Sequence, residues 1–224
     1  MTHEYAVRPL GADDLPALLR LHAAVMAALP DPSMFRLFGG AESFLSSHFG
    51  ARGESLGFFA EEHLVGYGSL TRPAAEDLDN YARNLDWDAS RAGRVGLLSA
   101  AMVDPTHRGQ GLHPALITAR IELARERGLP ELLVRAAPAN ALSRRTLLAH
   151  GFALVWLGVQ AEGSLRHVFW RPVETAAWAD DGAPLSWAAG DDLPGQQRLL
   201  REGCIGVATR EGDAAIGFAR SNID

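Results

Sequence analysis

The alternation of hydrophobic and polar positions along the chain predicts strands and helices in turn. Apolar runs bounded by glycine, proline or acidic turns are typical of strands, and apolar residues that recur every three or four positions are typical of helices. The pattern predicts strands at residues 5–8, 56–60, 64–70, 94–103, 131–136, 152–159 and 165–170. It predicts helices at residues 13–26, 42–49, 110–127 and 140–150, and a variable helical insert at residues 74–90. This order predicts an α+β fold, a mixed and mostly antiparallel sheet with helices on its faces.

A glycine turn separates the fourth predicted strand from the longest predicted helix. The apolar residues stop at Asp104-Pro105, and a turn that contains Arg108, Gly109 and Gly111 follows. A strand, a tight glycine turn and a helix N-terminus present consecutive backbone N–H groups to an anion, and the arginine adds a positive charge. The turn therefore predicts a diphosphate site. The alternative is an ordinary helix start that binds nothing.

Two common phosphate motifs do not match this turn. The nucleotide P-loop requires Gly-Lys-Ser/Thr, which is absent, and the G-x-G-x-x-G dinucleotide fingerprint fails because Pro114 occupies its third glycine position. A proline is compatible with the first turn of a helix, where its missing N–H would have no helical partner.

Composition and charge limit the classes of function. Hydrophobic residues make up 47% and charged residues 21% of the chain, which indicates a globular protein. The net charge of −6, without a basic run, disfavours a nucleic-acid partner. Cys204 is the only cysteine, so no internal disulfide and no cysteine-based metal site is expected, and the eight histidines show no metal-ligand spacing. No apolar run is long enough to span a membrane. We expect a soluble, cytoplasmic protein without a bound metal.

Two sequence blocks resemble the GNAT (Gcn5-related N-acetyltransferase) superfamily. The first is Val-Asp-Pro-x-x-Arg-Gly-Gln-Gly-Leu at residues 103–112, which resembles the acyl-CoA signature Q/R-x-x-G-x-G/A that opens a helix after the fourth strand. The second is Asn140-x-x-Ser143 followed by Gly151-Phe152. The order of predicted elements extends the resemblance to residues 4–171.

The resemblance implies an acyl-CoA-dependent N-acyltransferase that carries acetyl from acetyl-CoA to the amine of a small molecule. In the family the end of the fourth strand pairs with the pantetheine amides, the glycine turn receives the pyrophosphate, and the asparagine block contacts the pantetheine arm. The cofactor-binding residues implied here are Ala101, Met102, Val103, Arg108, Gly109, Gln110, Gly111, Leu112, His113, Asn140 and Ser143.

The sequence departs from the family pattern at two positions. His113 replaces the last glycine or alanine of the signature, but its backbone N–H is retained. Leu147 stands where the family often has a tyrosine that protonates the leaving thiolate. Candidate replacements for the acid, each with a structural role as the alternative, are His150, His113, Tyr67 and Tyr81. Glu61 or Glu62 is the candidate for a base that acts through water.

The last fifty residues are expected to lie outside the acetyltransferase domain at 1–172. We expect a linker at 173–184 and a truncated GNAT-like half-repeat at 185–224. The residues Asp-Asp-Leu-Pro occur at 13–16 and again at 191–194, each followed at the same spacing by Arg-Leu, and a similar hairpin follows each copy. Such a half-repeat is too small for its own core. It must dock on the first domain or on another subunit, and the second alternative makes the protein a homodimer. Cys204 is expected to be a buried, inert thiol.

Three classes of function are consistent with these residues. The first is the acetyltransferase, the second a CoA-binding sensor that has lost catalysis, and the third an interaction protein with an ordinary glycine turn. The resemblance implies that residues 30–49 and 81–87 hold the acceptor. Their apolar side chains indicate a partly hydrophobic substrate, and nearby acidic groups would suit a cationic amine. The apolar residues are Met34, Phe35, Phe38 and Trp87.

Overall fold

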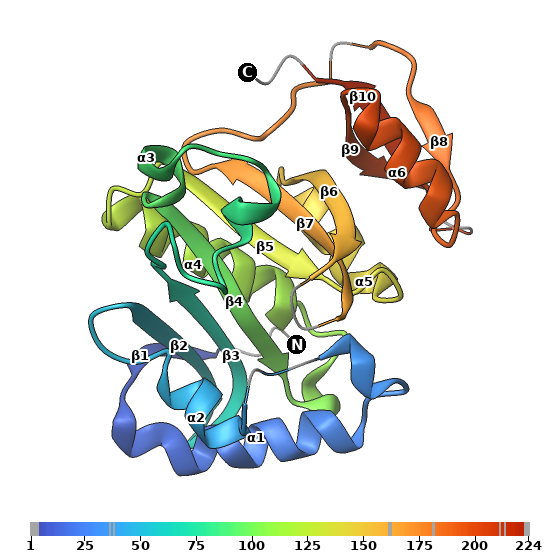
Figure 1. Ribbon diagram of the computed structural model, residues 1–224. Helices are drawn as coiled ribbons and strands as arrows, with labels where there is room; N and C mark the ends of the chain where they lie inside the picture. The colour runs from blue at the N-terminus through green and yellow to red at the C-terminus, as the bar shows by residue number, and fades with distance from the viewer. Residues whose placement is uncertain are drawn as a thin grey trace. The chain divides into compact units, whose positions relative to one another are not determined.

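A computed structural model describes residues 5–35, 37, 39–160, 163–180, 182–210, 212 and 214–221 (Figure 1). The chain divides into two units. The first contains Met1–Pro73 and Gly96–Leu129, and the second contains Ala74–Val95 and Pro130–Asp224. Phe38, which was predicted to contact the acceptor, lies outside the described residues.

The first unit contains four antiparallel strands in the order β1 (Ala6–Leu10), β2 (Gly53–Ala60), β3 (His63–Thr71) and β4 (Val95–Val103). The first strand extends two residues beyond its predicted end at residue 8, because Pro9 pairs with Leu56 and Leu10 with Ser55 inside β1. β1 stands at the end of the strand order, and a proline is tolerated in an edge strand, where its missing N–H breaks no ladder bond.

Helices cover both faces of this four-stranded segment. α1 (Leu15–Ala27) and α2 (Ala41–Ser46) pack on one face, around Tyr67 and Met102. α4 (Leu112–Glu126) packs on the other, with Leu112 and Leu116 against Val65. The short 3-10 helices η1 (Ala12–Asp14) and η2 (Pro32–Met34) flank α1.

The N-terminus of α1 has no side-chain cap. Asp14 occupies the N-cap position of α1 but makes no side-chain cap there. Its carboxylate instead accepts hydrogen bonds from Gly11 N at 3.0 Å and from Arg8 Nη2 at 2.7 Å. The Arg8 hydrogen bond lowers the pKa of Asp14. The residue therefore ties the helix start to β1.

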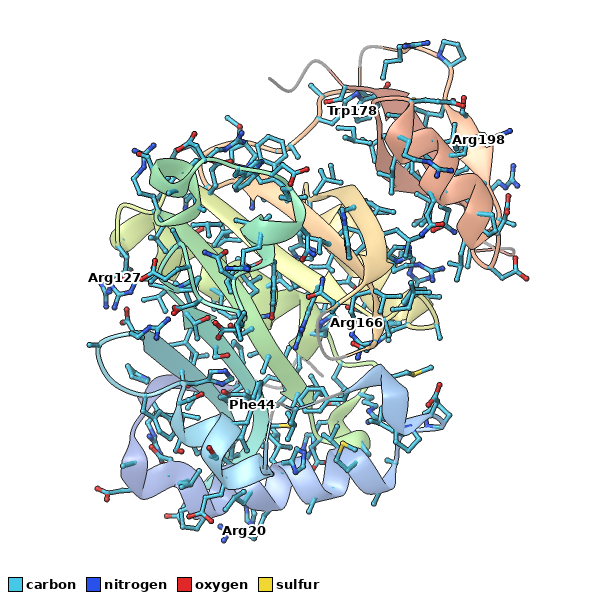
Figure 2. The ribbon with its side chains drawn as sticks, viewed as in Figure 1. Arg20, Phe44, Arg127, Arg166, Trp178 and Arg198 are labelled. Atoms are coloured by element: carbon cyan, nitrogen blue, oxygen red, sulfur yellow. The ribbon has the colours of Figure 1, made fainter. Side chains whose placement is uncertain are left out.

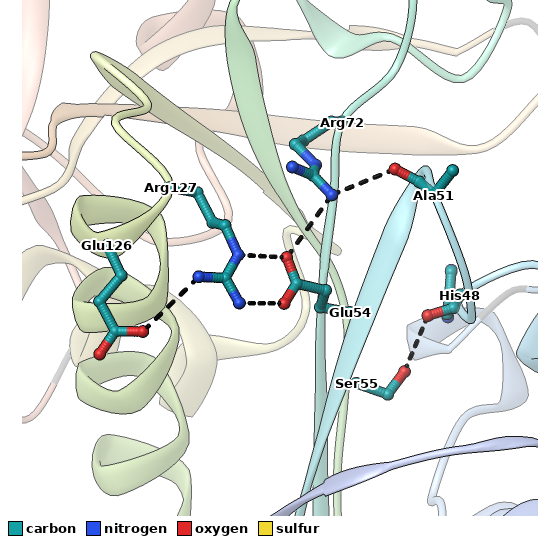
Figure 3. Close-up of polar contacts among 7 residues, drawn as sticks. All are labelled: His48, Ala51, Glu54, Ser55, Arg72, Glu126 and Arg127. Carbon is teal, nitrogen blue, oxygen red and sulfur yellow. Dashed lines mark hydrogen bonds and ion pairs between the residues drawn. The ribbon is translucent and has the colours of Figure 1, made fainter.

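An ion-pair cluster fixes the C-terminal end of α4 to the sheet (Figure 3). Glu54 on β2 accepts two hydrogen bonds from Arg127, at 2.9 Å from Nε and 2.7 Å from Nη2. Arg72 approaches the same carboxylate at 3.5 Å. These contacts, the Arg127 hydrogen bond first, lower the pKa of Glu54. The cluster orients α4 from the end opposite its glycine turn.

The second unit contains six strands in the order β5 (Glu131–Ala136), β7 (Leu165–Pro172), β6 (Ala153–Val159), β9 (Cys204–Thr209), β10 (Ile216–Arg220) and β8 (Ser186–Ala188). The described neighbours pair antiparallel. α5 (Ala141–Ala149) and α6 (Leu193–Arg201) pack against β6 and β9.

The insert at 74–90 is less helical than predicted. It contains η3 (Tyr81–Asn84) and the start of the four-residue helix α3 (Ala89–Ala92). The buried Asn80 side chain organises the segment, because it accepts from Ala82 N and donates to the carbonyls of Ala74 and Ala92. These bonds satisfy backbone groups that a longer helix would have paired internally. η4 (Pro105–His107), in the first unit, completes the set of short helices.

The tail is integrated into the sheet of the second unit. Gly206 of β9 pairs with Leu154 of β6, so the tail extends the sheet. The element order strand, helix, strand, strand repeats that of the chain start, but β8 pairs with β10, whereas β1 pairs with β2. The half-repeat stays a prediction. Cys204 begins β9 and is half-buried rather than buried as expected.

Candidate functional site

The C-terminal end of β4 is held on both faces in the first unit. Met102 is 2% exposed and packs in the cluster around Tyr67. Val103, half-buried, packs on the opposite face against Leu112 and Leu116 of α4. Ala101 pairs with Gly68 of the neighbouring strand β3. The segment predicted to pair with pantetheine is therefore a well-fixed strand end.

Asp104 organises the chain directly after β4. Its carboxylate accepts hydrogen bonds from Thr106 N at 2.8 Å and Thr106 Oγ1 at 2.5 Å, and it lies 3.6 Å from His107 Nδ1. Burial acts to raise the pKa of Asp104, but the hydrogen bonds from Thr106 and His107 outweigh it and lower the pKa. The sequence indicated Asp104 only as a strand end. Its role as the cap of η4 is a local Asx motif that the spacing to Thr106 would have signalled.

Gly109 and Gly111 require glycine for their backbone conformation. Their φ angles are +76° and +81°, in the left-handed region. A Cβ added to either would have no heavy atom within 4 Å, so the space beside both is open. Because Gly111 is the N-cap of α4, the helix begins at Leu112, two residues later than predicted.

The N-terminus of α4 is suited to an anion. Gly111 supplies no side-chain cap, and the first helical hydrogen bond after the turn runs from Ala115 N to Gly111 O at 3.1 Å. The N–H of Leu112 therefore has no partner inside the helix. Pro114 removes a donor that the helix does not use. Uncapped N–H groups and the positive end of the helix dipole fit a diphosphate.

The side chains of the turn differ in exposure and in their hydrogen bonds. Arg108 is exposed and, within the described part of the chain, forms no ion pair. The Gln110 side chain accepts a hydrogen bond from Tyr5 Oη at 2.6 Å and donates to Thr106 O at 3.4 Å. His113 is half-buried at the second position of α4. Tyr5 and Gln110 are 105 residues apart in the sequence, and no pattern in the sequence predicts their contact.

The Asn-x-x-Ser block lies in the second unit and forms the N-cap of α5. Asn140 Oδ1 accepts a hydrogen bond from Ser143 N at 3.0 Å, the usual geometry between an N-cap side chain and the third helical residue. The spacing of the block is therefore explained by capping. None of the described residues accepts a hydrogen bond from Asn140 Nδ2, which leaves an amide donor at a half-buried position.

Leu147 and His150 lie near the other end of α5. Leu147 is 1% exposed, so it is a core residue of the second unit. His150 is half-buried, and its Nδ1 lies 2.7 Å from Thr146 O, which makes Nδ1 the donor. His150 lines an open pocket of about 530 Å³ together with Trp178 and Asp180. Figure 2 labels Trp178.

Tyr67 lies in the core of the first unit. It is fully buried, and its Oη lies 2.7 Å from His48 Nδ1. Burial raises the pKa of Tyr67 to about 12 and lowers the pKa of His48 to about 4. The ring of Phe44, labelled in Figure 2, contacts the His48 ring edge-on at 4.5 Å between centroids. Both groups are neutral near pH 7, and the pair has the properties of a structural contact.

The remaining candidate acids and bases are Tyr81, Glu61 and Glu62. Tyr81 is 4% exposed in the second unit, with the Arg135 guanidinium 5.0 Å from its ring centroid. Glu61 and Glu62 are exposed at the β2–β3 turn, where Glu61 has a φ of +54°. The assignment of an acid or base to any candidate stays a prediction.

Solved structures with a similar fold are acetyltransferases. The ribosomal-protein-S18-alanine N-acetyltransferase from Escherichia coli is 17% identical, covers 80% of this chain and 99% of its own, and has a TM-score of 0.56. An N-acetyltransferase from Staphylococcus aureus Mu50 is 13% identical over 77% of this chain and 99% of its own, with a TM-score of 0.58. Arabidopsis thaliana NAA60, solved in complex with acetyl-CoA, is 16% identical over 77% of this chain and 100% of its own, with a TM-score of 0.57. These structures confirm the predicted α+β fold, a mixed and mostly antiparallel sheet with flanking helices.

Sequence comparison gives the family. No curated protein matches the chain. No helix among the described residues combines the length and apolar character needed to cross a membrane. The model of the acetyltransferase (GNAT) family matches residues 22–152, more than half of the 224 residues, and this range includes both the glycine turn and the asparagine block. The chain therefore belongs to the GNAT family, and it is an N-acetyltransferase that uses acetyl-CoA.

Proposed function

We propose that the protein transfers acetyl from acetyl-CoA directly to the amine of a small molecule. The observation that carries the acyl-CoA assignment to particular residues is the uncapped N-terminus of α4, with open space beside Gly109 and Gly111. When bound, acetyl-CoA supplies an activated thioester.

Three groups of residues have separate roles in this proposal. The N–H groups from Gly109 to Leu112 and the Arg108 guanidinium bind the pyrophosphate. The backbone of residues 101–103 orients the pantetheine arm by strand-like pairing. The Asn140 amide, in the second unit, has its oxygen occupied by capping and keeps its N–H donors available. Its contact with pantetheine stays a prediction from the family resemblance.

Positioning supplies most of the rate in this proposal. Holding an amine against a thioester converts a bimolecular step into an effectively unimolecular one. A general acid adds a smaller factor. The buried Leu147 side chain cannot donate a proton, so the thiolate leaves either unassisted or with a proton from one of the candidate acids.

Direct transfer has the support of the cysteine content. A ping-pong route needs an acyl-enzyme nucleophile, and a thiol is the side chain that is least dependent on activation for this role. The single cysteine, Cys204, begins β9 in the tail, outside the matched residues 22–152. The proposal therefore predicts a ternary complex, which initial-rate kinetics distinguishes from a ping-pong pattern by intersecting rather than parallel double-reciprocal lines.

The test combines calorimetry with an activity screen. Arg108→Glu is expected to weaken CoA binding at least about tenfold, because the side chain beside the pyrophosphate changes from positive to negative. Arg125→Glu, at an exposed position near the opposite end of α4, is the charge-reversal control and is expected to bind as the wild type does. Equal affinities for the two variants would refute the site.

The activity screen measures thiol release from acetyl-CoA against a panel of small amines. Turnover with at least one amine supports the proposed acceptor class. Tight CoA binding without turnover on small amines, or turnover only on protein N-termini, would contradict it. The first of these outcomes would favour the CoA sensor.

A further inference from the structure

The pairing of β3 with β4 changes register within the first unit. Ser69 pairs with Ala100, but the next aligned pair is Thr71 with Leu97. Two steps along β3 therefore span three steps along β4, which places one extra residue in β4 at 98–99. A β-bulge bends its strand and leaves backbone groups without their ladder partners. The bulge directly precedes the strand end at 101–103.

The side chain of Arg120 supplies donors at this bulge. Arg120 lies on α4, is 2% exposed, and donates from Nη1 to Ala100 O at 3.0 Å and to Ser69 O at 3.4 Å. Its Nε donates to Leu116 O at 2.9 Å, which fixes the guanidinium along its own helix. Burial lowers the pKa of Arg120 to about 10, so the group remains a cation at neutral pH.

Gly68 makes room for this contact. A Cβ at Gly68 would lie 2.8 Å from Arg120 Nε and 3.1 Å from Arg120 Cζ. The φ angle of Gly68 is not in the left-handed region, so its lack of a side chain is required by the guanidinium and not by its backbone. Burying a cation costs free energy unless the cation is hydrogen-bonded. The carbonyls of β3 and β4 provide these hydrogen bonds to Arg120, and Gly68 leaves the space for them.

We propose that Arg120 is a positioning residue for acyl-CoA, because it holds the β4 bulge and so sets the direction of residues 101–103. The inference rests on the proposed role of that strand end in binding pantetheine. Arg120 does not touch the cofactor in this proposal. It links the helix whose N-terminus binds the pyrophosphate to the strand that orients the thioester arm.

The test displaces the guanidinium in two independent ways. Arg120→Lys keeps a cation but loses the planar guanidinium, whose Nε and Nη1 together reach the carbonyls of Leu116, Ala100 and Ser69. Gly68→Ala keeps the arginine but pushes it away. Both are expected to raise the KM for acetyl-CoA, because the strand end that pairs with pantetheine is displaced. They are expected to lower kcat/KM by up to about 100-fold, the effect that a misplacement of about 1 Å can have.

Gly57→Ala is the matched control for loss of stability. A Cβ at Gly57 would come within 2.6 Å of Leu10, a comparable clash in the same sheet that does not involve Arg120. All variants are assayed well below their melting temperatures. A purely structural role predicts lower melting temperatures for all three variants and an unchanged KM, and that result overturns the proposal.

The two proposals fail in different ways. If the wild type does not bind CoA, both are wrong. If the wild type binds CoA and loses affinity in Arg108→Glu, while Arg120→Lys and Gly68→Ala keep the wild-type KM, only the role of Arg120 is refuted.

Discussion

Gly111 combines a left-handed backbone with an open side toward solvent. Gly111→Ala is expected to destabilise the protein by about 1 kcal/mol, because an L-residue is strained at a φ of +81°. It is also expected to weaken CoA binding about tenfold, because the methyl group stands where the pyrophosphate approaches. Thermal unfolding and calorimetry measure the two effects separately.

Gly128, at the other end of α4, provides the control. Its φ is +65°, and a Cβ there would also meet no heavy atom within 4 Å. Gly128→Ala is therefore expected to reproduce the loss of stability without the loss of affinity. If Gly128→Ala weakened CoA binding equally, the effect would be due to strain in the helix and not to the turn.

Burial of His48 makes stability depend on pH in the first unit. Its pKa is about 4 in the folded state, whereas an unfolded histidine titrates near about 6.5. The unfolded state therefore binds more protons between these values, so the free energy of unfolding falls as the pH is lowered from about 6.5 to about 4. The largest slope from one such histidine is about 1.4 kcal/mol per pH unit.

His48→Gln removes this titration and retains a polar partner for Tyr67. Urea unfolding at a series of pH values is expected to show a shallower slope for this variant. His167 keeps a residual slope in the second unit, because burial also lowers its pKa to about 4. His63→Gln, at an exposed position, serves as the control. An unchanged slope in His48→Gln would contradict the assignment.

At the scale of elements, α5 depends on one side chain for its start. Asn140→Ala is expected to lose the cap and about 1 kcal/mol of stability. Asn140→Asp retains an oxygen for Ser143 N but has no amide donor, so it is expected to fold as stably as the wild type and to bind CoA more weakly. Thermal melts and calorimetry on the two variants separate capping from a contact with pantetheine. Normal affinity in the stable aspartate variant would leave the asparagine with a structural role only.

At the scale of the whole molecule, Gln196 anchors the tail inside the second unit. It is fully buried, its Oε1 accepts from His167 Nε2 at 2.9 Å, and its Nε2 donates to Ala189 O at 2.8 Å and Gly190 O at 3.2 Å. Gln196→Leu leaves several buried polar groups without partners, at a cost of about 3 kcal/mol.

Gln197→Leu is the neighbouring control for this prediction. Gln197 is half-buried and makes one bond, of 3.3 Å to Leu157 O. Its loss is expected to lower the free energy of unfolding by less than about 1 kcal/mol. Chemical denaturation measures both variants. Equal effects would show that the tail is held mainly by its apolar contacts.

Local features of the protein could be predicted from the linear order of its residues. The order of strands and helices, the glycine turn before α4 and the start of α5 at Asn140 follow from hydrophobic periodicity and from the conformational preferences of a few residues. These preferences act over one to four residues, so they are visible in a linear pattern. The same locality explains the errors, because Pro9 and the insert at 74–90 are decided by strand pairing and by the Asn80 side chain.

Contacts between residues far apart in the sequence depend on how the folded chain packs. Tyr67 contacts His48, Arg120 reaches the carbonyls of β3 and β4, and Gln196 pairs with His167, and no spacing in the sequence signals these contacts. Each of these contacts joins two elements whose distance depends on how a whole face of the sheet packs. A shift of one residue in strand register would turn every side chain of the strand to the other face and remove the contact. The glycine turn can therefore be predicted from the sequence. The contact of the buried Arg120 with β4 can be recognised only in the folded protein.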